Sequence, residues 1–153
     1  MIGIILATVL VSLPLVPSQV NSPFTLYEYM RANFTYQNEA EGVDYWQTPE
    51  ETAKLKTFDC EDASFFSEKV LTQLGYEAYS IAIYSKQNGE IYFHSICVVQ
   101  VNGKWEYFSN GYYSYFKSFE SINEIISFEC PTWKWYSRIE LPHKFVDKHI
   151  KTN

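Results

Sequence analysis

Helical periodicity dominates the first half of the chain. Over residues 24–36, apolar side chains recur at spacings of three and four, the period of an amphipathic helix. A polar loop is expected over residues 38–44. After it, Thr48-Pro49-Glu50-Glu51 combines an N-cap hydroxyl, a proline at the first helical position and a glutamate three residues after the cap. This capping box predicts that a second, short helix begins after Thr48.

A third helix is predicted to begin near Cys60. Apolar residues at positions 63, 66, 70, 71 and 74 fall on one stripe, and Gly75 suits a left-handed residue that ends the helix. Asp59 can cap the amino end, where Glu61 and Asp62 are favoured by the helix dipole.

After Gly75 the apolar positions alternate, which indicates strands. The predicted strands cover Tyr76–Ser85, Ile91–Val101 and Lys104–Ser109. Asn88-Gly89 and Asn102-Gly103 separate them, and these pairs favour the two-residue turns of antiparallel hairpins. The middle of the chain therefore predicts an antiparallel meander.

The pattern weakens towards the carboxyl terminus. It predicts a short helix over residues 121–127, an aromatic segment over 132–141 and a polar tail over 148–153 that frays. Because helices come first and antiparallel strands follow, we expect one α+β domain over residues 23–147, with the N-terminal helices packed on an antiparallel sheet.

The first residues form a separate segment. Residues 2–16 are apolar apart from Thr8 and Ser12, a run too short for a spanning helix but typical of a signal peptide. Val20-Asn21-Ser22 then offers small residues for cleavage. An exported or cell-surface protein is expected, with residues 1–22 as leader; a membrane tether through residues 2–16 and a buried or extraneous segment are the alternatives, and a cytoplasmic location is less favoured.

Composition narrows the class of protein further. Twelve basic residues against 18 acidic residues give a net charge of −6, without a basic cluster, which argues against nucleic-acid binding. Three cysteines cannot all pair within the chain, so at least one thiol is free or bonded to another chain.

Cys60 is the candidate nucleophile. At a helix amino terminus the dipole stabilises a thiolate by about 0.3–1 kcal/mol. The neighbouring carboxylates of Asp59, Glu61 and Asp62 oppose it, at roughly 0.7 kcal/mol each for a separation of about 6 Å in water. A reactive Cys60 therefore needs a cation from elsewhere in the fold, and His94 is the candidate.

His94 lies within a predicted strand and needs polar partners on its ring. If Asn102-Gly103 is the turn, positions that sum to about 205 face each other, which brings Asn110 within reach and makes Ser109 the adjacent alternative. Cys–His–Asn is a workable set of nucleophile, base and orienting residue. The plain alternatives are a structural cysteine and a core histidine.

A zinc site built from Cys60, His94 and Cys97 is disfavoured. His94 and Cys97 are separated by an odd number of residues, so they point to opposite faces of a strand. No metal and no cofactor is expected.

At these residues the sequence resembles the transglutaminase-like superfamily, which has a papain-like fold, and especially its microbial cysteine-peptidase-like members. The matching segments cover residues 44–52, 59–63, 74–76, 94–98, 102–105 and 108–111. The resemblance implies that Cys60 is the nucleophile and His94 the base. It places the third position, an Asp in most of the family, at Ser109 or Asn110.

The resemblance also suggests the rest of the site. The oxyanion would be bound by the Cys60 backbone N–H and by Gln47 or Trp46. Trp46, Tyr112 and Tyr113 are candidates for substrate contact, with core packing as the rival role. The leading hypothesis is a thiol-dependent hydrolase or acyltransferase with a peptide or protein substrate. The alternative is an inactive module that binds a peptide or glycan at the cell surface.

Overall fold

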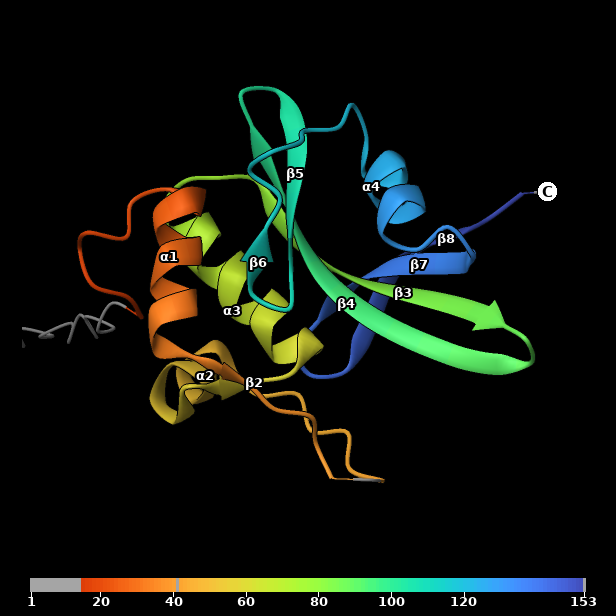
Figure 1. Ribbon diagram of the computed structural model, residues 1–153, viewed down its shortest axis with the longest axis horizontal. Coiled ribbons are helices and arrows are strands. Elements are labelled where there is room, and N and C mark those ends of the chain that lie inside the picture. The colour runs from red at the N-terminus through yellow and green to blue at the C-terminus, as the bar shows by residue number, and fades with distance from the viewer. Residues whose placement is uncertain (1–14, 41, 153) are drawn as a thin grey trace, which may run out of the picture.

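The computed structural model describes residues 15–40 and 42–152, and contains four helices within them (Figure 1). They are α1 (Pro23–Asn33), α2 (Pro49–Leu55), α3 (Cys60–Gln73) and α4 (Ile122–Glu129). The capping box predicted for α2 is confirmed: Thr48 Oγ1 accepts from the Glu51 N–H at 3.2 Å, and the Glu51 carboxylate accepts from the Thr48 N–H at 2.7 Å.

The start and end predicted for α3 are also confirmed. Asp59 is its N-cap, since the Asp59 carboxylate accepts from the Asp62 N–H at 3.2 Å. Gly75 follows the C-cap with φ +90°, the left-handed conformation that glycine adopts without strain. Cys60 is thereby fixed as the first residue of the helix.

A six-stranded antiparallel sheet forms the centre of the fold, in the order β6-β5-β4-β3-β7-β8. Its strands are β3 (Ala78–Gln87), β4 (Glu90–Val101), β5 (Lys104–Ser109), β6 (Tyr112–Tyr113), β7 (Trp133–Glu140) and β8 (Lys144–Ile150). A separate parallel pair joins β1 (Thr35–Tyr36) to β2 (Thr57–Phe58), immediately before the α3 N-cap.

The register between β4 and β5 follows the predicted turn. Ile96 pairs with Ser109 and Val101 with Lys104, so paired positions sum to 205 as expected. Because β5 ends at Ser109, β4 continues past it without a partner on that side within the described chain. His94 lies in this continuation.

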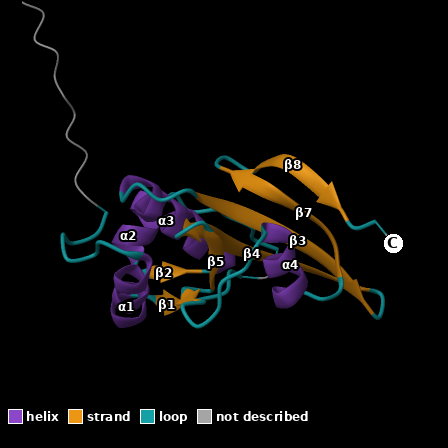
Figure 2. Cartoon of the chain, turned by 90° about the horizontal axis from the view of Figure 1, so that it is seen from above, coloured by secondary structure: helices purple, strands orange, loops and turns teal. Residues whose placement is uncertain are grey.

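The two faces of the sheet carry different cores. Cys97 and Val99 of β4 pack with α1 and α3, whereas Ile96 and Val98 pack with α4. Alternate residues of one strand point to opposite faces, which explains this division. In Figures 1 and 2, α4 accordingly lies apart from the other three helices.

The terminal segments differ in part from the expectation. Frayed residues were expected from 148 onwards, but residues 148–150 belong to β8 and pair with β7. The ring of His149 stacks on Tyr136 at 4.8 Å, a packing contact that a tail of polar residues does not reveal. The predicted leader lies largely outside the described residues; Leu15 and Val16 pack against the α1–α3 core. No described helix is both long and apolar enough to cross a membrane.

Candidate functional site

The Cys60 thiol lies at the amino end of α3, where the neighbouring residue is its hydrogen-bond partner. Sγ donates to Glu61 Oε2 at 3.0 Å. Burial and then the negative charge of Glu61 raise the pKa of the thiol, whereas the Ser95 backbone N–H lowers it. The raising causes dominate, so Cys60 is a neutral thiol at neutral pH.

The carboxylates around Cys60 hold this part of the site together. Burial, and then the charge of Asp59, raises the pKa of Glu61. Asp62 is 1% exposed, and burial raises its pKa to about 7. Its carboxylate accepts from the Gln47 N–H at 2.7 Å and from the Asp59 N–H at 3.4 Å. Asp62 thus fastens the loop before α2 to the first turn of α3.

His94 is bound on the α4 side of the sheet. Its Nε2 lies 2.8 Å from Ser109 Oγ and 3.5 Å from Glu129 Oε1. Ser109 pairs with Ile96, which is two residues after His94 and therefore on the same face. Asn110 lies in the following turn with φ +50°, and its buried Oδ1 has no hydrogen-bond partner in the described structure. Of the two predicted third residues, Ser109 contacts His94.

Glu129 is a site residue that the sequence reasoning missed. At the end of α4, its Oε1 accepts from Ser109 Oγ at 2.6 Å and its Oε2 from Tyr107 Oη at 2.9 Å. The hydrogen bond with His94 is the largest of the causes that lower the pKa of Glu129 to about 2. The predicted helix ended at Ser127, and no local pattern indicates that a residue beyond that end would meet a strand 35 positions earlier.

One cleft, here called the Cys60 cleft, is lined by His94 and by Asp59 and Glu61, the residues on either side of Cys60; no hydrogen bond joins Cys60 to His94. The described cleft has a volume of about 380 Å³ and is lined by Val43, Asp44, Trp46, Asp59, Glu61, Ala82, Phe93, His94 and Phe145. Glu61, the partner of the Cys60 thiol, and His94 are therefore both wall residues. A carbonyl group in this cleft would lie beside His94 and beside the first turn of α3, which carries the Cys60 thiol.

Trp46 and Gln47 have different surroundings. Trp46 lines the cleft, stacks on His143 at 4.3 Å and donates its indole N–H to Asp44 at 2.9 Å. Gln47 is not among the described residues of the cleft wall: its Oε1 accepts from Thr52 Oγ1 at 3.2 Å, and its backbone N–H binds Asp62. Gln47 is held close to α3, with its side chain directed to α2.

Tyr112 and Tyr113 line a second cavity, of about 320 Å³, which also includes Ser109 and Glu129. Tyr112 is 64% exposed, whereas Tyr113 is buried and stacks on Phe108 at 4.7 Å. The two tyrosines thus share a cavity with Ser109 and Glu129, the contacts of His94, and neither of them lines the Cys60 cleft.

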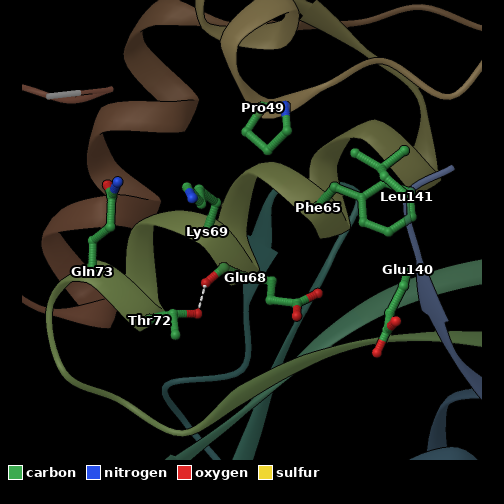
Figure 3. Close-up of a pocket in the computed structure, with 8 residues that line it drawn as sticks. All are labelled: Pro49, Phe65, Glu68, Lys69, Thr72, Gln73, Glu140 and Leu141. Carbon is green, nitrogen blue, oxygen red and sulfur yellow. Dashed lines mark hydrogen bonds between the residues drawn. The ribbon is translucent and has the colours of Figure 1, made fainter. Parts of the chain in front are cut away.

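A third hollow lies on the outer side of α3 (Figure 3). Its volume is about 350 Å³, and its lining residues are Pro49, Phe65, Glu68, Lys69, Thr72, Gln73, Glu140 and Leu141. It shares no lining residue with the Cys60 cleft. Glu68 is fixed in it, because its carboxylate accepts from the Ser80 N–H at 2.9 Å.

Cys60, Cys97 and Cys130 are all free thiols. Cys97 is fully buried on the α3 side of the sheet, opposite to His94. In the part of the chain that the structure describes, no three His, Cys, Asp or Glu residues are grouped to hold a metal ion.

Comparison with known proteins gives the family. Residues 16–127 match a family described as a transglutaminase-like domain. No curated protein matches significantly. Among solved structures, calcium-bound LapG of Legionella pneumophila is similar at 14% identity and TM-score 0.49, with 79% of this chain and 66% of that chain covered.

A putative cysteine protease from Cytophaga hutchinsonii is similar at 11% identity and TM-score 0.47, with 84% of this chain and 43% of that chain covered. The chain thus spans less than two thirds of the length of either protein. The family match covers more than half of the 153 residues, and the α+β architecture agrees with it. The chain belongs to the transglutaminase-like domain family.

Proposed function

We propose that the protein is a thiol-dependent hydrolase or acyltransferase that acts on peptide or amide bonds through an acyl-enzyme on Cys60. One observation carries the proposal: His94 of β4 lines the same cleft as Asp59 and Glu61, the residues on either side of Cys60 at the start of α3. Membership of the transglutaminase-like family supports it, because these two positions are the ones that the family resemblance assigns to nucleophile and base.

The proposed reaction begins from a neutral thiol. As Cys60 Sγ attacks the carbonyl carbon, His94 takes the thiol proton and then gives it to the departing amine. Water, or an acceptor amine, next attacks the thioester and restores the thiol. The Cys60 backbone N–H and a donor of the Trp46–Gln47 loop would bind the oxyanion. Because Cys60 Sγ donates a hydrogen bond to Glu61 in the resting structure, this bond must break before the thiol attacks the substrate.

An activated ester tests this chemistry without a known substrate. With p-nitrophenyl acetate, we expect a burst of p-nitrophenolate that matches the protein concentration, followed by slow turnover. Cys60→Ala should abolish the burst, and His94→Ala should slow it by about 10²- to 10⁴-fold, the usual contribution of a general base. Cys130→Ala is the matched control, because Cys130 is also a free, half-buried thiol. A burst rate that is insensitive to His94 would refute the proposal.

A second candidate function is a non-catalytic module that binds a peptide or glycan. Two observations favour it: the neutral Cys60 thiol is hydrogen-bonded to Glu61, and neither Ser109 nor Asn110, the two candidates for the third position, is the Asp that the family resemblance implies. Arrays of immobilised decapeptides and glycans separate the candidates. A binding module keeps its array signals after Cys60→Ala and shows no acylation, whereas the enzyme loses acylation.

The apolar leader supports an exported or cell-surface location for this activity. Expression of the full chain in a bacterium, followed by mass spectrometry of the exported fraction, tests it. Cleavage near Val20-Asn21-Ser22 supports a signal peptide, and a full-length product in the membrane fraction supports a tether. A full-length product in the cytosol alone contradicts both.

A further inference from the structure

On the neighbouring strand β5, the residue that contacts His94, the base of the proposed reaction, is a serine and not a carboxylate. Ser109, at the end of β5, is one of the two positions where the family resemblance implies an Asp; the other is Asn110, and neither residue carries a charge. The acidic group near His94 is Glu129, which reaches it from α4. The orienting charge thus comes from a different element of the fold.

The protons of this network can be assigned by counting donors. Glu129 is ionised and can only accept, so the single hydroxyl proton of Ser109 lies in its 2.6 Å bond to Oε1. Ser109 Oγ must then accept in its 2.8 Å contact with His94. The proton of that contact therefore belongs to His94 Nε2, and in the neutral ring the free lone pair is on Nδ1.

Glu129 is held in place independently of His94. Ile125 and Ile126 of α4 are fully buried against the sheet, and Ser121 caps the helix. Tyr107 donates to the second carboxylate oxygen, which leaves Oε1 for Ser109. Ser109, Tyr107 and His94 are the polar groups of the sheet that contact this carboxylate.

We infer that Glu129 is a positioning residue, which acts through Ser109 to hold His94 as the Nε2–H tautomer with Nδ1 free as the base. That Nδ1 removes the proton of the Cys60 thiol rests on the proposed function. The tautomer itself does not, because it follows from the contacts of His94, Ser109 and Glu129 alone.

Nitrogen-15 NMR of the histidine rings tests the tautomer directly in the full chain. We expect a proton on His94 Nε2 in the wild-type protein. In Glu129→Gln, the amide can donate to Ser109 and free its hydroxyl to donate to His94, so we expect a mixture of tautomers. Glu124→Gln is the matched control, since Glu124 is an exposed carboxylate of the same helix.

A double variant separates positioning from a merely structural role. Ser109→Asp combined with Glu129→Gln places a carboxylate, which only accepts hydrogen bonds, at position 109 of β5, and should restore the Nε2–H tautomer of His94. Acylation by p-nitrophenyl acetate should fall by about 10- to 10⁴-fold in Glu129→Gln, the upper limit corresponding to a base held in the wrong tautomer, and recover in the double variant. Circular dichroism checks that each variant is folded.

The outcomes distinguish the two proposals. An unchanged single tautomer in folded Glu129→Gln, or a wild-type protein without Nε2–H, overturns the positioning role. A tautomer that responds to Glu129 while Cys60 never forms an acyl-enzyme upholds the positioning role and refutes the proposed function.

Discussion

At the scale of single residues, Glu61 controls the state of the Cys60 thiol. Before the structure is considered, the three adjacent carboxylates, at roughly 0.7 kcal/mol each, already outweigh the helix dipole, at about 0.3–1 kcal/mol. The structure strengthens this opposition, because the neutral Cys60 thiol donates a hydrogen bond to Glu61 Oε2 at 3.0 Å in a half-buried setting. The chemistry of Cys60 therefore depends on its nearest acidic neighbour as much as on His94.

Replacement of this neighbour should make the thiol more acidic. Glu61→Gln removes a negative charge next to Sγ, and we expect the pKa of Cys60 to fall by about one unit. Alkylation of Cys60 by iodoacetamide at pH 7.5 should then be about tenfold faster, as measured by mass spectrometry of the Cys60 peptide. Glu50→Gln, an exposed carboxylate in the first turn of α2, should leave the rate unchanged. An equal rate in both variants would show that burial alone sets the reactivity.

At the scale of elements, sequence reasoning worked best where local chemistry decides. Thr48 and Asp59 cap the helices as predicted, and Asn102-Gly103 sets the register that brings Ser109 to the face of His94. Glu129 and β8 could not be predicted, because each depends on a packing partner far away in the sequence. The contact of Cys60 with Glu61 depends on a side-chain rotamer, which no pattern encodes.

Asp62 joins the loop before α2 to the first turn of α3, and its contribution to the free energy of unfolding should depend on pH. Burial raises the pKa of Asp62 from 3.8 to about 7 in the folded protein, so folding favours the protonated form. The stability that this group contributes is full below about pH 4 and is lost as the pH rises through 7. Asp62→Asn should flatten the dependence of the free energy of unfolding on pH in this window, as measured by urea denaturation. A slope identical to that of the wild type would contradict the burial of a neutral Asp62.

At the scale of the whole molecule, stability rests on two large apolar cores that share one sheet, and on a smaller cluster around Trp46 and Phe65. Phe66 on α3 is fully buried in the first core, and Ile125 on α4 in the second. The strands between them contribute alternate residues to each core. The site lies where both cores approach β4, so its geometry depends on the packing of both layers.

Removal of a large core side chain should therefore be costly. Phe66→Ala should lower the free energy of unfolding by about 3–5 kcal/mol, through lost burial and a residual cavity. Phe116→Ala, at a residue that is 70% exposed, should change it by less than about 0.5 kcal/mol. Urea denaturation at one pH measures both. Similar losses in the two variants would mean that Phe66 is not a core residue.

The two sides of the sheet supply different parts of the candidate site. Cys60 arrives with α3 on one face, and Glu129 arrives with α4 on the other. A folding intermediate in which only one helical layer has docked would hold either a thiol without a fixed base or a fixed base without a thiol. If the proposed function holds, Cys60 should form an acyl-enzyme only after both layers have docked, and the appearance of acylation during refolding would mark that moment.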